Sequence, residues 1–266
     1  IEFINKIDGI FAFIIYDIKN EKIFAARDPL GVKPLLYSFR KDGIIFSSDV
    51  NSFFTLLEKP LPINKAIVDL LSLTFVPEPI TLFKEINHLE TGFVFKYNLS
   101  GKILNSYKIN NNLGRKNSFN GESFQKSCKN LDLLLKESIE KQTLSDKKVG
   151  LFLSSGLDSS LIFSYLVGIK DKLLLALTLV WKPLMNLNDF QESEKEAKKL
   201  AIHLGFDSHF EVSPPSKIKG LEKILRYMVI EGLTDPAAIS TYYLSQKARK
   251  LGCKVMLCGQ GADEIF

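Results

Sequence analysis

The sequence lacks any apolar run long enough to cross a membrane, which takes about 18 residues. Its richest apolar stretch, Asp8 to Ile18, is much shorter and contains two aspartates, Asp8 and Asp17. The first residues, Ile1 to Asn5, show no basic region followed by a long apolar segment, so we expect no signal peptide. These absences argue against a membrane protein.

Cysteine and histidine are also scarce, with three of each among 266 residues. An odd number of cysteines without metal-binding spacing is typical of a reducing cytosol, so we expect a cytoplasmic location. The histidines are scattered along the chain, which argues against a zinc site. These residues are Cys128, Cys253, Cys258, His88, His203 and His209.

Neither sign of charge dominates the sequence, which has 35 basic and 30 acidic residues and a net charge of +5. Proteins that bind nucleic acids usually gather Lys and Arg on one face, whereas here basic residues alternate with acidic ones, as in Lys19 to Lys22. We therefore expect no nucleic-acid partner. The composition is that of an ordinary globular chain, and its length suggests about two domains.

The first part of the chain is predicted to be β-rich. Apolar runs joined by turn-forming residues predict three strand pairs. The predicted strands are 11–17 and 22–27, 35–39 and 43–48, and 92–97 and 102–107. A polar stretch rich in Asn, 110–121, follows and is interpreted as a linker. We place the boundary near residue 118, which gives one domain over 1–118 and a second over 119–266.

Beyond the linker, the apolar spacing predicts helices that alternate with strands. Such alternation builds a parallel sheet with right-handed crossovers, so the second domain is expected to be α/β. In the first predicted helix, 122–142, one apolar face carries Phe124, Leu131, Leu134, Leu135 and Ile139. The other predicted helices are 159–167, 191–204 and 236–250, and the predicted strands are 149–153, 173–180, 209–212 and 254–258.

The sharpest chemical feature is a loop of small and hydroxyl residues between a predicted strand and a predicted helix, Leu151 to Ser160. Small residues let backbone N–H groups approach an anion, and the helix N-terminus adds a favourable dipole. Asp158 would repel a bare phosphate, which suggests that it holds Mg²⁺ to which phosphates also bind. The pattern indicates a phosphate site, but Ser and Asp are also common helix N-caps. It is not a Walker loop, because no Gly-Lys-Ser/Thr follows.

A second glycine-rich turn, followed by acidic residues, lies between Leu257 and Glu264. Gly259 and Gly261 permit close backbone approach, and Asp263 could share a cation with Asp158. A plain turn with solvated acids would have the same pattern. Two such loops in one parallel sheet favour a ligand site, because open α/β sheets bind ligands at the carboxyl ends of their strands.

Five segments, in the same order, resemble the family of glutamine-hydrolysing asparagine synthetases. Ser154 to Ser159 resembles the Ser-Gly-Gly-x-Asp-Ser loop of ATP pyrophosphatases, and Cys258 to Glu264 is similar to the Ser-Gly-x-Gly-x-Asp-Glu segment of asparagine synthetases. The other three segments are Thr234 to Leu244 and, in the family's glutaminase domain, Asp8 to Phe13 and Ala26 to Leu35.

The resemblance implies a partial class II glutamine amidotransferase domain of the Ntn type, α+β and β-rich. A truncated α/β ATP-pyrophosphatase domain, like that of adenine nucleotide α-hydrolases, would follow it. The implied activity is ATP-dependent amidation of aspartate to asparagine through β-aspartyl-AMP, with ammonia from glutamine and with AMP and pyrophosphate released. The implied cofactors are ATP and Mg²⁺, the partners are these small-molecule substrates, and a homodimer is left open.

Position by position, the resemblance implies that Asp158 and Asp263 are catalytic and hold Mg²⁺. The implied pyrophosphate ligands are Ser154, Ser155, Gly156, Asp158 and Ser159, and the implied adenosine pocket is lined by Leu153, Leu179, Cys258 and Gly259. For Leu179, which ends an apolar strand, core packing stays an open alternative.

The sequence departs from the family at both ends. The family's nucleophile is an N-terminal cysteine, and no such residue begins this sequence, while Cys128 follows the linker at a helical position. The sequence stops at Phe266, directly after the Asp-Glu pair. We therefore expect a fragment that lacks both natural ends and is inactive as written.

Two substitutions also depart from the family pattern. Ser155 stands where the family usually has Gly, which costs about 1 kcal/mol if the position needs a positive φ and otherwise adds a donor. Gln260 stands where many members have Asp or Glu, and a carboxylate could accept a proton from attacking ammonia whereas an amide could not. In the full-length protein, we expect activity to survive these substitutions with an altered rate.

Two other functions stay open. The first is a related amidotransferase that adenylates another carboxylate, in a sugar, a peptide or a β-lactam precursor. The second is a degenerate, non-catalytic ATP-binding protein, which Ser155 and Gln260 favour. The presence of both Asp158 and Asp263 argues against the second, since an acidic pair that faces phosphates is costly without Mg²⁺.

Overall fold

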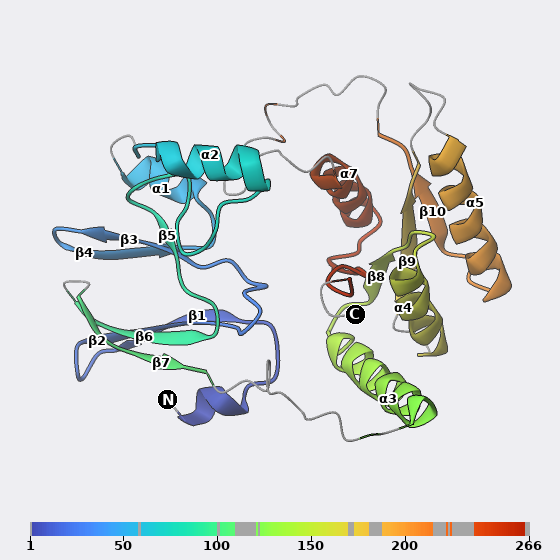
Figure 1. Ribbon diagram of the computed structural model, residues 1–266, viewed down its shortest axis with the longest axis horizontal. Coiled ribbons are helices and arrows are strands. Elements are labelled where there is room, and N and C mark those ends of the chain that lie inside the picture. The colour runs from blue at the N-terminus through green and yellow to red at the C-terminus, as the bar shows by residue number, and fades with distance from the viewer. Residues whose placement is uncertain are drawn as a thin grey trace. The chain divides into compact units, whose positions relative to one another are not determined.

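The computed structural model describes residues 2–57, 60–99, 102–109, 121, 123–169, 173–180, 188–214, 222, 224 and 237–263. The chain forms two compact units (Figure 1). Unit 1 comprises Ile1–Lys116 with Glu222–Asp235, and unit 2 comprises Asn117–Leu221 with Pro236–Phe266. The predicted fold class, an antiparallel β-rich part followed by a parallel-sheet α/β part, is confirmed.

Unit 1 is built on two antiparallel sheets with the strand orders β1-β2-β6-β7 and β4-β3-β5. Aromatic side chains fill the space between the sheets: Tyr97 of β6 is fully buried, and its ring centroid lies 5.7 Å from that of Phe46 of β4. The strands are β1 (Ala12–Asp17), β2 (Lys22–Arg27), β3 (Leu36–Arg40), β4 (Gly43–Ser47), β5 (Asn87–His88), β6 (Phe93–Asn98) and β7 (Ile103–Lys108). The helices are the short 3-10 helix η1 (Glu2–Lys6), α1 (Asn51–Leu56) and α2 (Asn64–Leu73).

A buried ionic turn joins the two sheets of unit 1, between β2 and β3. The Arg27 guanidinium donates to the carbonyls of Lys33, Gly31 and Leu89 and to the Glu78 carboxylate, at 2.8 to 3.0 Å. The neighbouring Asp28 carboxylate accepts backbone N–H bonds from Leu30, Val32 and Lys33. Because both charges are buried and hydrogen-bonded, the turn is held in one conformation.

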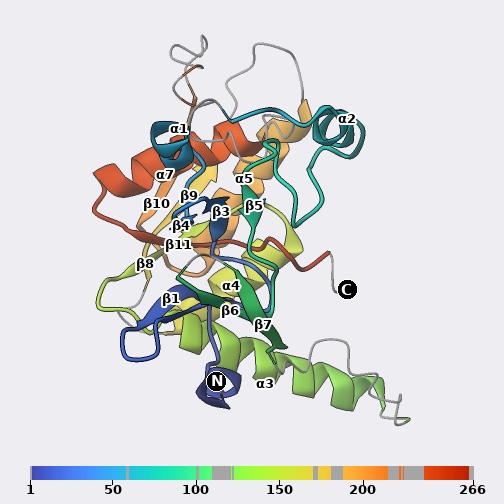
Figure 2. The same ribbon diagram turned by 90° about the vertical axis from the view of Figure 1, so that its left-hand side faces the viewer.

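Unit 2 is a four-stranded parallel sheet in the order β10-β9-β8-β11 with helices on both faces. In Figure 1, α7 lies on one side of this sheet, and α4 and α5 lie on the other. The helix α3 lies at one end of the unit in both ribbon views (Figure 2). The elements are α3 (Phe124–Gln142), β8 (Val149–Phe152), α4 (Leu157–Gly168), β9 (Leu173–Leu179), α5 (Asn188–His203), β10 (His209–Val212), α7 (Ala237–Lys250) and β11 (Val255–Leu257).

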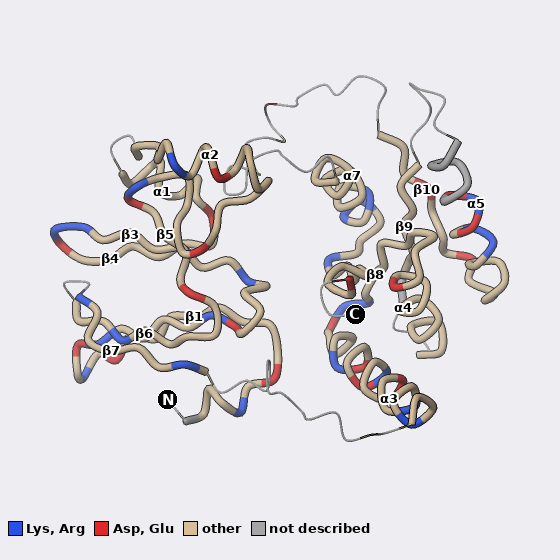
Figure 3. The backbone as a smooth tube through the Cα atoms, viewed as in Figure 1, with Lys and Arg blue, Asp and Glu red and all other residues tan. Residues whose placement is uncertain are grey.

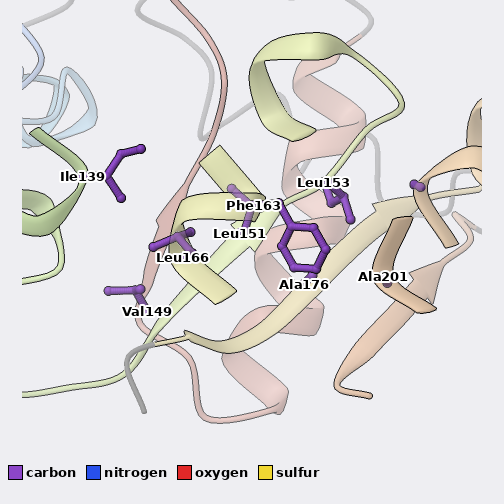
Figure 4. Packing of buried hydrophobic residues seen from close by; sticks show 9 residues of the cluster. Ile139, Val149, Leu151, Leu153, Phe163, Leu166, Ala176 and Ala201 are labelled. Carbon is purple, nitrogen blue, oxygen red and sulfur yellow. The ribbon is translucent and has the colours of Figure 1, made fainter. Parts of the chain in front are cut away.

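Alternate residues of the central strand β8 face the two layers of helices. Leu151 and Leu153 are buried against Phe163 of α4 and Ala201 of α5 (Figure 4). Phe152 points the other way and packs into the cluster that contains Leu244 of α7. This packing fixes the direction in which the chain leaves the carboxyl end of β8.

The predicted strands agree with the observed ones to within one or two residues, but the helices show two differences. In unit 1, η1, α1 and α2 were not predicted from the sequence. In unit 2, the predicted apolar face of α3 is mostly exposed: Leu134 is 63% exposed, and of the five residues only Ile139 is buried. The predicted linker lies outside the described residues except for Gly121.

Among the residues that the structure describes, no helix has the length and apolar character needed to span a membrane. Acidic and basic residues are interleaved along α3 and α5 rather than gathered by sign (Figure 3).

Replacing Gly31 by Ala tests the buried ionic turn. Gly31 has a φ of +65°, and an added Cβ would overlap Thr91 Cγ2 and lie 3.0 Å from Arg27 Nη2. We expect the free energy of unfolding of unit 1 to fall by about 2–4 kcal/mol, from backbone strain and overpacking combined.

Gly205→Ala is the matched control. Gly205 has nearly the same φ, +66°, but nothing lies within 4 Å of its added Cβ. This variant should lose only about 1 kcal/mol from unit 2, as measured by denaturant unfolding. Equal losses in the two variants would show that the turn is not tightly packed.

Candidate functional site

The two loops singled out in the sequence follow neighbouring strands of the unit 2 sheet. β8 ends at Phe152 and is followed by Ser154–Gly156, and β11 ends at Leu257 and is followed by the turn from Cys258 to Asp263. The strands are parallel, with Leu257 opposite Leu151, so both loops leave the sheet at the same edge. The structure therefore brings together the two motifs, which are about a hundred residues apart in the sequence.

Hydroxyl groups hold the first loop in shape. The Ser154 N–H donates to Ser159 Oγ at 3.2 Å, and the two Ser Oγ atoms lie 2.8 Å apart. The Gly156 N–H donates to Ser154 Oγ at 3.1 Å. Ser159 is buried and its hydroxyl points back into the loop, while Ser154 and Ser155 are exposed. The loop is thus folded on itself at the start of α4, with exposed hydroxyl residues at the carboxyl edge of the sheet.

The N-cap of α4 is Gly156, which has an extended backbone and no side chain to cap the helix. This finding corrects the alternative in which the Ser and Asp residues serve as an ordinary N-cap. Anions bind at helix N-termini through backbone N–H groups and the helix dipole. Ser155 is not among the described residues with a positive φ, so the Ser in place of Gly carries no such strain there.

Gly259 packs directly on the first turn of α4. A Cβ added to Gly259 would lie 2.8 Å from the Ser159 backbone nitrogen and 2.9 Å from Asp158 Cβ. Real Cβ atoms are essentially never found this close to other atoms, so only glycine fits this position. The close approach joins the second loop to the first and places the chain that leads to Asp263 beside Asp158.

The two carboxylates suit a cation that substrate phosphates also bind. Asp158 is half-buried in the first turn of α4, and Asp263 is exposed in the turn after β11. No group of three His, Cys, Asp or Glu residues gathers anywhere in the described ranges. Mg²⁺ usually binds one or two carboxylates together with substrate phosphates, so this donor set fits Mg²⁺ better than a metal held wholly by protein.

The residues predicted to line an adenosine pocket lie around the same edge. Leu153 is buried, and its N–H donates to the Leu177 carbonyl at 2.8 Å. Leu179 ends β9 and packs on the core cluster beside α7, so it has a structural contact whatever else it touches. Cys258 is exposed just beyond β11. The segment Thr234 to Leu244 enters α7 at Ala237, and 234–236 lie outside the described residues.

In unit 1, the structure brings the two segments that resemble a glutaminase domain together. The Asp28 N–H, in the buried ionic turn, donates to the Phe11 carbonyl at 2.9 Å. In unit 2, a buried hydroxyl that the sequence analysis did not single out, Thr178, bonds the carbonyl of Leu153. It lies in an apolar strand, and no local pattern in the sequence marks it.

Two family models match the chain. The asparagine synthase model matches residues 130–266, just over half of the chain. The model of a glutamine amidotransferase domain matches residues 1–108.

The relatives with similar sequences are much longer than this chain. Asparagine synthetase [glutamine-hydrolyzing] 1 of Bacillus subtilis is 32% identical over 98% of this chain and 40% of its own length. The human asparagine synthetase [glutamine-hydrolyzing] is 27% identical over 97% of this chain and 45% of its own. The chain thus spans less than half the length of these curated relatives. A solved structure of a glutamine-dependent NAD+ synthetase from Acinetobacter baumannii aligns with 94% of this chain and 60% of its own at 13% identity, with a TM-score of 0.32, too low to bear on function.

Replacing Gly259 by Ala tests the contact between the loops. The added methyl group cannot fit against the backbone of α4, so the second loop has to move away. We expect a loss of about 1–3 kcal/mol in the stability of unit 2 and faster amide hydrogen exchange at the first turn of α4.

Gly168→Ala serves as the control, because nothing lies within 4 Å of a Cβ at this last residue of α4. Hydrogen exchange at the start of α4 should stay unchanged in this variant. Unchanged exchange in Gly259→Ala as well would mean that the two loops are independent.

Proposed function

Because the chain belongs to the asparagine synthase family, we propose that the protein activates a carboxylate with ATP and converts it to an amide, with aspartate as substrate and asparagine as product. The observation that carries the proposal is the meeting of the two loops, with Gly259 against the first turn of α4. Domain 119–266 would perform this synthesis, and domain 1–118 would be the glutaminase part that supplies ammonia.

In the first step, an oxygen of the aspartate side-chain carboxylate attacks the α-phosphorus of ATP. The bond between the α-phosphorus and the bridging oxygen breaks, pyrophosphate leaves and β-aspartyl-AMP remains. In the second step, ammonia attacks the activated acyl carbon, loses a proton, and AMP leaves. Activation is needed because a free carboxylate is a poor acceptor for ammonia.

The loop Ser154–Gly156 and the first turn of α4 would bind the departing pyrophosphate. The exposed residues Ser154 and Ser155 and the start of α4 would supply donors at one place, and Ser159 fixes the loop from within. Asp158 and Asp263 would hold Mg²⁺, which when bound would neutralise the charge that develops on the phosphates. Leu153, Leu179, Cys258 and Gly259 would line the adenosine pocket.

Removing either carboxylate should abolish the first step. In the full-length protein, supplied with ATP, Mg²⁺, aspartate and ammonium so that the glutaminase step is bypassed, Asp158→Asn and Asp263→Asn should each lower AMP release at least about 100-fold, because charge stabilisation of the leaving group is lost. AMP and pyrophosphate release are measured with aspartate and with other carboxylates as acceptors.

Asp146→Asn is the control, because Asp146 precedes β8 and so lies at the opposite edge of the sheet, where it is exposed. It should retain full activity. Wild-type protein that releases no AMP with any carboxylate would refute the proposed function. AMP release with an acceptor other than aspartate would keep the chemistry and change the substrate.

Gln260 provides a test of the second step. Gln260→Glu in the full-length protein should raise ammonia-dependent turnover by about tenfold, since a carboxylate can accept the proton that ammonia loses. Exchange of pyrophosphate into ATP, which reports the first step alone, should stay the same. Unchanged turnover would show that no carboxylate acts as a base at this position.

A further inference from the structure

A buried polar chain lies behind the loop, at the carboxyl edge of the unit 2 sheet. The Thr178 hydroxyl, on β9, donates to the Leu153 carbonyl at 2.9 Å. The Thr178 hydroxyl oxygen also lies 2.7 Å from Nε2 of His209, on the neighbouring strand β10. Thr178 is only 3% exposed, and apolar residues surround it on the same face of the sheet. Polar groups are costly in such a place unless they are fully hydrogen-bonded.

The valence of the hydroxyl fixes the direction of both bonds. A carbonyl can only accept, so the single hydroxyl proton of Thr178 points to Leu153. The bond to His209 must then be donated by His209, which therefore carries a proton on Nε2. Burial lowers the pKa of His209 below its ordinary value and Lys198 adds to that shift, although Glu211 opposes it, so the neutral ring is favoured. The bond to Thr178 then places the one ring proton on Nε2. The Leu153 carbonyl, the Thr178 hydroxyl and the His209 Nε2–H are thus linked by two hydrogen bonds.

These hydrogen bonds hold the backbone at Leu153, directly after the end of β8. The last register pair of β8 and β9 is Phe152 with Leu177, and the next residue, Leu153, directly precedes Ser154. Its N–H bonds the Leu177 carbonyl, and its own carbonyl takes the Thr178 hydroxyl. Both backbone groups of Leu153 are thus held by β9. The point at which the loop leaves the sheet is set by a side chain rather than by a further pair of the ladder.

We propose that Thr178 and His209 are positioning residues, which hold the Leu153 carbonyl and thereby set the loop Ser154–Gly156 in the geometry that binds the phosphates of ATP. This inference rests on the proposed function of the loop. His209 orients the Thr178 hydroxyl, and Thr178 orients Leu153. A loop fixed before the ligand arrives binds it without the cost of ordering it. Neither residue needs to touch the nucleotide.

The test uses paired variants of the full-length protein. Thr178→Val keeps the shape and removes the hydroxyl, and Thr178→Ser keeps the hydroxyl. His209→Leu removes the ring donor, and His209→Gln restores a donor at the position of Nε2. We expect the KM for ATP to rise about tenfold in Thr178→Val and His209→Leu, with kcat changed less than twofold. The Ser and Gln variants should stay within about threefold of the wild-type KM.

Thr143→Val separates positioning from simple stability. Thr143 is also a buried Thr of unit 2, and its hydroxyl donates to the Glu140 carbonyl at 2.7 Å, at the end of α3. This variant should show a drop in Tm similar to that of Thr178→Val, but it should keep the wild-type KM for ATP. A variant that only loses folded protein lowers the apparent kcat and leaves KM unchanged.

Hydrogen exchange separates failure of this inference from failure of the proposed function. Thr178→Val should speed amide exchange in residues 154–160, and Thr143→Val should not, whether or not ATP is the ligand. Unchanged exchange and unchanged KM in Thr178→Val would overturn the inference while wild-type AMP release upholds the function. If Thr178→Val speeds exchange but the wild-type protein releases no AMP, the proposed function is refuted. The role of Thr178 and His209 in binding ATP is then refuted with it.

Discussion

Contact between the Gly259 backbone and the first turn of α4 is the constraint on which the candidate site depends. A parallel sheet brings the ends of β8 and β11 side by side, but strands are about 4.8 Å apart and their loops are free to diverge. Gly259 lies so close to Ser159 and Asp158 that no side chain fits between them. Because Gly259 has no Cβ, the two neighbouring loops pack directly against each other. Asp158 and the turn that leads to Asp263 therefore lie on adjoining segments.

In unit 1, two segments are also held together, but by buried charged groups and not by a close contact at a glycine. The turn that holds Arg27 and Asp28 has to connect β2 of one sheet with β3 of the other. Burying either charge alone would be strongly unfavourable, but the guanidinium and the carboxylate are bonded to backbone groups of the turn itself. The segment from Ala26 to Leu35, which resembles a glutaminase domain, therefore has an architectural reason for its composition.

Apart from the two-residue strand β5, which was not predicted, the sequence predicts the strands well because they are apolar runs that end at turn residues. It predicts the loops because small residues and acids follow two such runs. The helix α2 could not be predicted in this way: Ile63 provides no side-chain cap at its start, and Thr74, not glycine, ends it with a φ of +68°. The contact of Thr178 with His209 could not be predicted from the sequence either. It links residues 31 positions apart and depends on the strand register that pairs His209 with Ala176.

Asp158, in the first turn of α4, bears on what kind of anion the proposed site would bind. The start of an α-helix is equivalent to about half a positive charge, which one aspartate more than cancels. Two unit charges 4 Å apart near a protein surface interact by about 4 kcal/mol, so a bare polyphosphate beside Asp158 would be repelled. A loop of serine and glycine without the acid would bind free phosphate better. The presence of Asp158 in the first turn, with Asp263 on the adjoining loop, is therefore explained if the ligand arrives as a complex with a divalent cation, as nucleotides do, and not if the loop were a simple anion site.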